Sequence, residues 1–236
     1  MQWKTIESNK RRIVHQIQKI DNFQGKPAPI IRFRSSLKGP CVGECFGNFI
    51  MDLEERKKWD PQIAQVYEIH PIFDLDAANI AMGFGKYGEC SRLGVGYCQT
   101  KANFGITPRE QLTLCGVQNF AADGSCIIWG VEMEEWHDHL LPPGQRQTRA
   151  KSHIFSTTLT PTSDNTFDVE YVLQLEIGGK IPTFLTTPIV TDTVKSLFQR
   201  ASDFFAAGEG GELDQFLKKK EAEASVNNRH SLLVTP

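Results

Sequence analysis

The chain has 236 residues and a formal net charge of −2, with 40% hydrophobic and 23% charged residues. This balance gives no sign of a nucleic-acid partner, and no apolar run approaches the roughly 20 residues that span a bilayer. The length suits one domain, or one domain followed by a tail.

Six cysteines, at positions 41, 45, 90, 98, 115 and 126, form no C-x-x-C pair. Most fall inside expected helices or strands, which favours buried free thiols in a reducing compartment. The first twelve residues contain no apolar signal core. We therefore expect a cytoplasmic protein.

The first quarter of the chain predicts two strands and a helix. Apolar and polar residues alternate over 13–20 and again over 30–34, and the loop 21–29 would join them as a hairpin. Between 41 and 58 the apolar residues recur at helical spacing, and the last turn is cationic, as the helix dipole favours. The segment 59–61 ends this helix, with the tryptophan packing on the sheet and the aspartate capping the next turn.

The middle of the chain predicts a run of antiparallel strands with turns between them. The expected strands cover 63–70, 95–102, 110–120, 125–136 and 149–160. The stretch 74–95 contains four glycines and predicts no regular element. Its segment 83–88 lacks the order of a phosphate-binding loop.

Residues 166–208 are the most regular part of the sequence. Odd positions from Phe167 to Ile177 are apolar or aromatic, so one face of this strand lies in a core or cavity. Gly178-Gly179 ends the strand, and an amphipathic helix over 182–207 begins at Pro182.

These elements predict an α+β fold in which a curved antiparallel sheet wraps around a long C-terminal helix and leaves a tunnel between the layers. The expected domain covers 1–208. The remainder, 209–236, is expected to be a charged and disordered tail in which only 212–223 could extend as a solvated helix.

Five segments in this order resemble the START domain, the lipid-transfer domain of the steroidogenic acute regulatory protein family, which has the helix-grip fold. They are Trp3-Lys4, Glu55-Arg-Lys-Lys-Trp-Asp60, Thr107-Pro-Arg-Glu110, Pro142-Pro-Gly-Gln-Arg-Gln-Thr-Arg149 and Leu175-Glu-Ile-Gly-Gly-Lys-Ile-Pro182. The resemblance covers about residues 3–207. It departs from the family in lacking the helix that usually precedes Trp3, and over 74–96.

The resemblance implies one lipid bound in the tunnel, without chemistry, and transferred or sensed at membranes. The lipid could be a phospholipid, a sterol or a ceramide-like molecule. Alternation places Tyr171 and Leu173 (with Val169 and Leu175) on the tunnel wall, and likewise Trp129 (with Ile127, Val131 and Met133). The alternative is that these side chains fill a solid core.

The resemblance also implies polar groups that hold the lipid head. Arg109 matches a family arginine that points into the cavity in some relatives, and its alternative is a surface salt bridge. Tyr171 and Gln145 match positions that contact head groups in some members, although a core tyrosine and a solvent-exposed glutamine are equal alternatives. Phe184 and Phe198 on the C-terminal helix complete the lipid-binding candidates.

The loop 137–148 is the expected lid. Leu140 and Leu141 at its tip, together with Leu185 on the facing helix, would contact a membrane surface. The alternative is that the leucines fold back onto the core.

Catalytic and metal-binding interpretations are weaker. His137-Asp-His139 has no fourth ligand at a recognisable spacing, and there is no G-x-S-x-G elbow. We expect no catalytic residues, metal or cofactor. Two alternatives remain, an enzyme on the same scaffold with His153 beside an acid inside the cavity, and a ligand-sensing domain of a larger protein.

Overall fold

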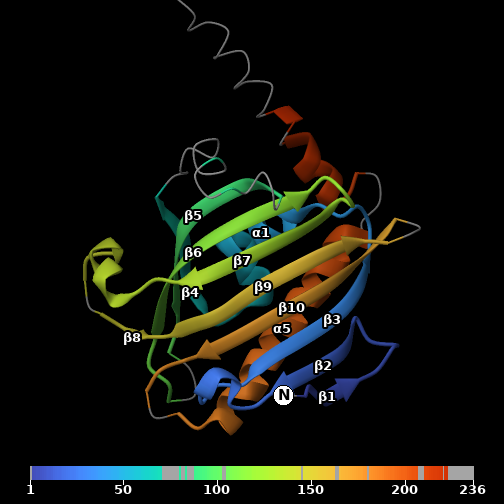
Figure 1. Cartoon of the computed structure of the whole chain (residues 1–236). Coiled ribbons are helices and arrows are strands. Elements are labelled where there is room, and N and C mark those ends of the chain that lie inside the picture. The colour runs from blue at the N-terminus through green and yellow to red at the C-terminus, as the bar shows by residue number, and fades with distance from the viewer. Residues whose placement is uncertain are drawn as a thin grey trace, which may run out of the picture.

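The computed structural model describes residues 2–222 except 71–79, 81–82, 84–87, 103–104, 145, 163–164, 180, 207–209 and 220. Its main element is a ten-stranded sheet (Figure 1). The strands run in the spatial order β1 (Lys4–Ser8), β2 (Val14–Ile20), β3 (Ile30–Lys38), β10 (Thr166–Glu176), β9 (Lys151–Pro161), β7 (Ser125–Glu132), β6 (Arg109–Phe120), β5 (Glu89–Thr100) and β4 (Ile63–His70). All these neighbours are antiparallel, and the short β8 (Thr148–Arg149) pairs in parallel with the start of β6.

Two groups of helices pack on the sheet. The long helix α5 (Thr183–Ala206) crosses one face beside β3 and β10, and α1 (Gly43–Met51) and α2 (Leu53–Trp59) lie near its C-terminal half (Figure 1). Two short 3-10 helices, η1 (Phe23–Gly25) and η2 (Glu135–Leu140), occupy connections. The expected fold class, a curved antiparallel sheet on a long C-terminal helix, is confirmed.

Helix α5 contains a proline close to its start. Pro188 lies within the helix and has no N–H, so the carbonyl of Phe184 receives no hydrogen bond from the residue four positions on. The first turn of α5 is therefore held less firmly than the turns that follow it.

The single helix expected over 41–58 is wrong. Asp52 adopts an extended conformation (φ −90°, ψ 123°) that separates α1 from α2, and its side chain accepts a 2.9 Å hydrogen bond from the backbone N–H of Glu55. Aspartate favours such N-cap positions because its side chain replaces a missing backbone acceptor. The apolar spacing continues across the break, so the periodicity did not reveal it.

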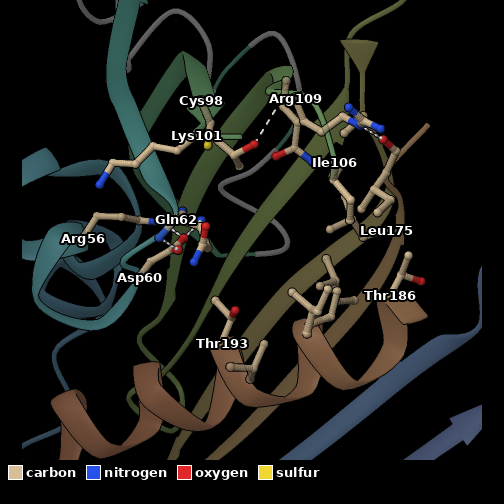
Figure 2. A pocket seen from close by; sticks show the side chains of 18 of the residues that line it. Arg56, Asp60, Gln62, Cys98, Lys101, Ile106, Arg109, Leu175, Thr186 and Thr193 are labelled. Atoms are coloured by element: carbon tan, nitrogen blue, oxygen red, sulfur yellow. Dashed lines mark hydrogen bonds and ion pairs between the residues drawn. The ribbon is translucent and has the colours of Figure 1, made fainter. Parts of the chain in front are cut away.

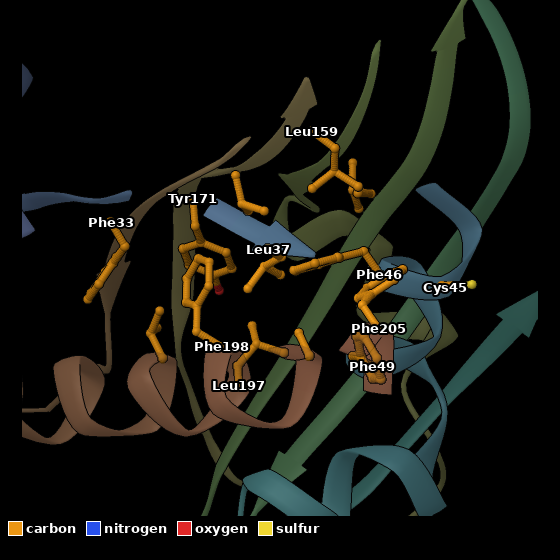
Figure 3. Packing of buried hydrophobic residues seen from close by; sticks show 14 of the residues in the cluster. Phe33, Leu37, Cys45, Phe46, Phe49, Leu159, Tyr171, Leu197, Phe198 and Phe205 are labelled. Atoms are coloured by element: carbon orange, nitrogen blue, oxygen red, sulfur yellow. The ribbon is translucent and has the colours of Figure 1, made fainter. Parts of the chain in front are cut away.

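The core lies between α5, α1 and the sheet (Figure 3). Phe46 of α1 stacks on Phe205 of α5 with ring centroids 6.1 Å apart, and Phe205 also meets Phe167 of β10 at 4.9 Å. The indole N–H of Trp59 donates to the carbonyl of Phe49 at 2.9 Å. Aromatic pairs of this kind add stabilisation to the burial of their area.

The expected boundary at residue 208 is wrong for the segment 212–219. These residues are helical, Leu213 is buried, and Phe216 and Leu217 pack against the main core. The side chain of Glu212 pairs with Arg200 of α5. This segment therefore packs as part of the domain and does not extend into solvent.

Candidate functional site

A cavity of about 180 Å³ lies between α5 and the sheet. Figure 2 shows that its floor is formed by α5 and its walls by β5, β6 and β10, with α2 at one end. Its apolar lining comes from Leu173, Leu175 and Ile177 of β10 and its extension, and from Ile189, Val190 and Val194 of α5. Alternation along β10 placed its two leucines on this wall correctly.

A second lobe of about 110 Å³ lies on the side of α1 and is called the inner lobe, and the first cavity is called the outer lobe. The two lobes share part of their walls, formed by Arg56, Cys98, Gln111, Tyr171, Leu173 and Leu175. The inner lobe adds Ile50, Met51, Val66 and Phe155 as apolar lining, and Thr113 and Ser152 as polar lining. Together the lobes form a mostly apolar space with a few convergent polar groups, as ligand sites commonly do.

Arg56, on the shared wall, forms an ion pair with Asp60, which lines the outer lobe (Figure 2). The guanidinium Nε and Nη2 atoms donate to Asp60 Oδ2 at 3.2 and 3.1 Å, and Nη1 donates to the carbonyl of Ile50 at 3.1 Å. Asp60 Oδ1 accepts from the backbone N–H of Gln62, which confirms its expected capping role. Burial alone would lower the pKa of Arg56, but neighbouring groups, Asp60 among them, raise it overall, so this arginine stays charged.

Sequence reasoning missed the place of this pair in the cavity wall. The spacing Arg-x-x-x-Asp within 56–60 puts both side chains on the same side of a helix, which was an available signal for an ion pair. Its orientation towards the cavity depends on the break at Asp52, which the sequence pattern did not reveal.

Tyr171 lies on the wall that both lobes share. Its ring is packed by Phe33, Phe155 and Phe198, and among the described residues its hydroxyl has no hydrogen-bond partner. Burial raises the pKa of Tyr171 to about 12, so the hydroxyl is neutral at physiological pH. Tyr171 is therefore a core residue through its ring, and its hydroxyl also lines the cavity, where a lipid head group was expected.

Arg109 lines the mouth of the outer lobe, and its guanidinium bonds to the backbone of the chain. Nε donates to the carbonyl of Ile177 at 2.6 Å, Nη1 to Thr107, and Nη2 to the carbonyl of Gly178 at 3.4 Å. No carboxylate of the described residues forms an ion pair with Arg109, so the alternative of a surface salt bridge is wrong. Arg109 ties the start of β6 to the loop before α5.

Three of the expected lipid-binding side chains lie elsewhere, and one of them, Phe184, is exposed in the first turn of α5 and lines neither lobe. Phe198 is fully buried in the solid core and lines neither lobe. Trp129 lies on the opposite face of β7, because the inward positions of that strand are Cys126, Ile128 and Gly130. Nearly every residue of 126–131 is apolar, so the pattern does not show which face of the strand points inward. The prediction that Trp129 faces the cavity is therefore wrong by one position.

The expected lid residues divide into two groups. Leu141 is buried and Leu140 is half-buried, both in a small cluster with Tyr97 on the sheet, so their expected membrane contact is wrong and the fold-back alternative is confirmed. Phe184 and Leu185, in the first turn of α5, are 72% and 50% exposed. Gln145 lies outside the described residues.

His153 does not provide the acid–base pair that the enzyme alternative required. Its ring nitrogens lie 3.4 Å from Glu132 and 3.1 Å from Glu176, but none of the three residues lines either lobe. Within the described residues no group of three or more histidine, cysteine or acidic side chains is arranged to hold a metal ion. In the same part of the chain no helix is long and apolar enough to cross a membrane.

Solved structures with the same fold cover most of the chain. Human StAR-related lipid transfer protein 5 matches 85% of this chain and 84% of its own with a TM-score of 0.63 at 17% identity. The human StarD13 lipid transfer and protein localization domain gives 0.61 at 13% identity, with 84% and 88% of the two chains covered. A STAR-related lipid transfer protein from Xanthomonas axonopodis gives 0.59 at 18% identity, with 84% and 97% covered. These likenesses establish the helix-grip fold of START domains.

No family model and no curated protein matches the chain.

Proposed function

We propose that this protein binds one lipid in the cavity between α5 and the sheet and carries or senses it at a membrane, without a chemical step. The observation that supports this most is the position of the cavity, directly behind the weakly held first turns of α5. Proteins whose names describe lipid transfer share the fold, which supports the same proposal.

The mouth of the outer lobe has the surface that such a carrier needs. Phe184 and Leu185 expose apolar side chains beside Ile189, which is partly exposed and lines the cavity. An exposed apolar cluster next to a cavity mouth is suited to the interfacial region of a bilayer. A lipid tail could then pass from the bilayer to the cavity wall without crossing water.

Native mass spectrometry of the protein purified from cells, with lipid extraction of the same sample, tests the proposal. We expect one co-purified lipid per chain in the wild type and none in Leu173→Trp, which fills the shared wall of the two lobes. Val131→Trp is the matched control, because Val131 is 55% exposed on β7 and lines neither lobe. A protein that stays empty and takes up no lipid from vesicles would contradict the proposal.

The membrane contact has its own test. Phe184→Ser combined with Leu185→Ser should reduce flotation with vesicles at least fivefold and leave the unfolding midpoint unchanged, since both side chains are exposed. Trp136→Ser on η2 is the control, because Trp136 is 73% exposed and lines neither lobe. Equal loss of flotation in the control would place the contact elsewhere.

Carrying and sensing differ in one measurement. A carrier moves labelled lipid between two vesicle populations at a rate that rises with protein concentration. A sensing domain binds the lipid and leaves the transfer rate at its uncatalysed level.

A further inference from the structure

The cationic side chains around the cavity already donate hydrogen bonds to acceptors of the protein itself. Arg56 is bound to Asp60 and to a backbone carbonyl, and Arg109 is bound to the backbone of Thr107, Ile177 and Gly178. Lys101 at the mouth is exposed and donates to the carbonyl of Pro61 at 3.0 Å. Among the described lining residues, no cation is left without an acceptor.

An ionised head group would disturb this arrangement. A phosphate or carboxylate that took Arg56 as its partner would leave Asp60, which is only 4% exposed, as an unpaired buried charge. Removing one member of a buried ion pair is strongly unfavourable because the remaining charge keeps its desolvation penalty. A cationic head group that took Asp60 would leave Arg56 in the same position.

The neutral polar groups of the cavity, in contrast, have hydrogen-bonding capacity to spare. Tyr171 and Ser152 are more than nine-tenths buried, and among the described residues neither hydroxyl has a partner. The side chains of Gln111 and Thr113 on β6 line the inner lobe and likewise have no partner in the described part of the chain. A buried hydroxyl or amide without a partner is costly, so a ligand that supplies one gains affinity.

The positions of these groups define one polar end of the site. Tyr171 of β10 and Gln111 of β6 lie on the wall that the two lobes share, and Ser152 of β9 lines the inner lobe alone. Towards α5 the outer lobe is lined mainly by leucine, isoleucine and valine side chains, with Thr186 and Thr193 of α5 among them. A lipid with a small polar end inside and an apolar body outside matches this distribution.

We infer that the lipid carries no ionised group and that its hydroxyl or carbonyl is held by Tyr171, Ser152 and Gln111 in the inner lobe. The inference rests on the proposed function and narrows it to uncharged lipids, such as sterols and acylglycerols. Under this assignment the Arg56–Asp60 pair remains closed when the lipid is bound and acts as a barrier to charged head groups.

Competitive capture from vesicles tests the inference. The purified protein is stripped of lipid and mixed with phosphatidylcholine vesicles that contain equal small amounts of cholesterol, monooleoylglycerol, oleic acid and phosphatidylserine. After the vesicles are removed, native mass spectrometry and lipid extraction identify the captured lipid. We expect cholesterol or monooleoylglycerol at least tenfold above each ionised lipid, phosphatidylcholine included.

The failures are distinguishable. Capture of oleic acid or a phospholipid in preference would overturn this inference and leave the carrier proposal intact. Capture of nothing would overturn both.

Two variants make the test specific to the named groups. Tyr171→Phe keeps the packed ring and should reduce capture of the uncharged lipid about fivefold, the scale of one hydrogen bond. Asp60→Asn keeps an acceptor for Gln62 but frees Arg56, and should raise the share of oleic acid at least fivefold. Asp168→Asn is the control, since Asp168 lies outside the cavity and bonds to Ser36.

Wild-type selectivity in Asp60→Asn would overturn the barrier role of the ion pair. Unchanged capture in Tyr171→Phe would overturn the assignment of the polar end. Thermal unfolding of each variant shows whether a loss of capture reflects loss of the fold.

Discussion

Arg109 is only 8% exposed. Its guanidinium donates hydrogen bonds to backbone carbonyls on both sides of the cavity mouth, which would otherwise need water as a donor. Arg109→Leu would leave the carbonyls of Ile177 and Thr107 without this donor. We expect the free energy of unfolding to fall by about 2–3 kcal/mol, because hydrogen bonds to a charged group are worth more than neutral ones. Urea denaturation followed by circular dichroism measures the change.

Arg146→Leu is the control for this substitution. Arg146 is exposed and bonds to the carbonyl of Asp138, so its loss should cost less than about 0.5 kcal/mol. Equal losses in the two variants would show that Arg109 has no special role in holding the loop.

Single residues also show where prediction from the sequence ends. Leu173 and Tyr171 were placed on the cavity wall correctly because β10 alternates between apolar and polar residues over most of its length. The prediction for Trp129 is wrong because apolar residues occupy both faces of its strand, so the sequence does not show which face points inward. Arg56 was missed because its direction depends on a helix break formed by one aspartate.

The loop between β10 and α5 depends on the backbone of Gly178. This residue has φ 70°, and a Cβ atom there would collide with the carbonyl oxygen of Arg149. Gly178→Ala should therefore lower the unfolding free energy by more than 2 kcal/mol, since the cost of positive φ and the steric overlap both apply. Gly105→Ala is the matched control, because Gly105 has φ 76° and no atom within 4 Å of the added carbon.

The control should lose only about 1 kcal/mol, the cost of the backbone conformation alone. A loss at Gly178 no larger than that at Gly105 would contradict the close approach of the loop to β8. The comparison is made by urea denaturation of both variants under the same conditions.

Helices α2 and α5 are joined by Glu55, which accepts a 2.8 Å hydrogen bond from Arg200. Burial alone would raise the pKa of Glu55, but hydrogen bonds from Lys58 and Arg200 lower it below its ordinary value. The ionised carboxylate therefore stabilises the fold above the unfolded-state pKa, near 4.3, and this contribution disappears as pH falls through the lower folded value.

Glu55→Gln should be less stable than the wild type by about 1 kcal/mol at pH 7, and the difference should shrink as pH falls from 5 to 3. Denaturation curves across this range measure it. Glu54→Gln, at an exposed pair with Lys57, should show less than about 0.5 kcal/mol at pH 7. A difference at Glu55 that grew towards low pH would contradict the assignment.

At the scale of the whole molecule, the domain extends beyond α5. Leu213 is buried in the main core, and Phe216 meets Phe204 with ring centroids 6.3 Å apart. Leu213→Ala should cost about 2 kcal/mol of unfolding free energy, in a single transition with the rest of the domain. Lys218→Ala, at an exposed position of the same segment, should cost less than about 0.5 kcal/mol.

A separate early transition for Leu213→Ala would contradict the membership of this segment in the domain. The sequence had suggested only a solvated helix, because three apolar residues among many charges look like a surface segment. Its packing against Phe204 of α5 is a tertiary contact, which the local pattern of apolar and charged residues does not reveal.

The proline in α5 has a consequence for how this protein could be altered. Pro188 leaves the turn at 183–187 one hydrogen bond short, while Phe198 and Phe205, farther along the same helix, stay fixed in the core. Fraying of that turn is thus a local event, whose free energy is separate from that of global unfolding. If the protein carries a lipid as proposed, substitutions that raise the melting temperature through the core should leave the rate of lipid exchange almost unchanged. Thermal stability and lipid exchange would then be two independently adjustable properties.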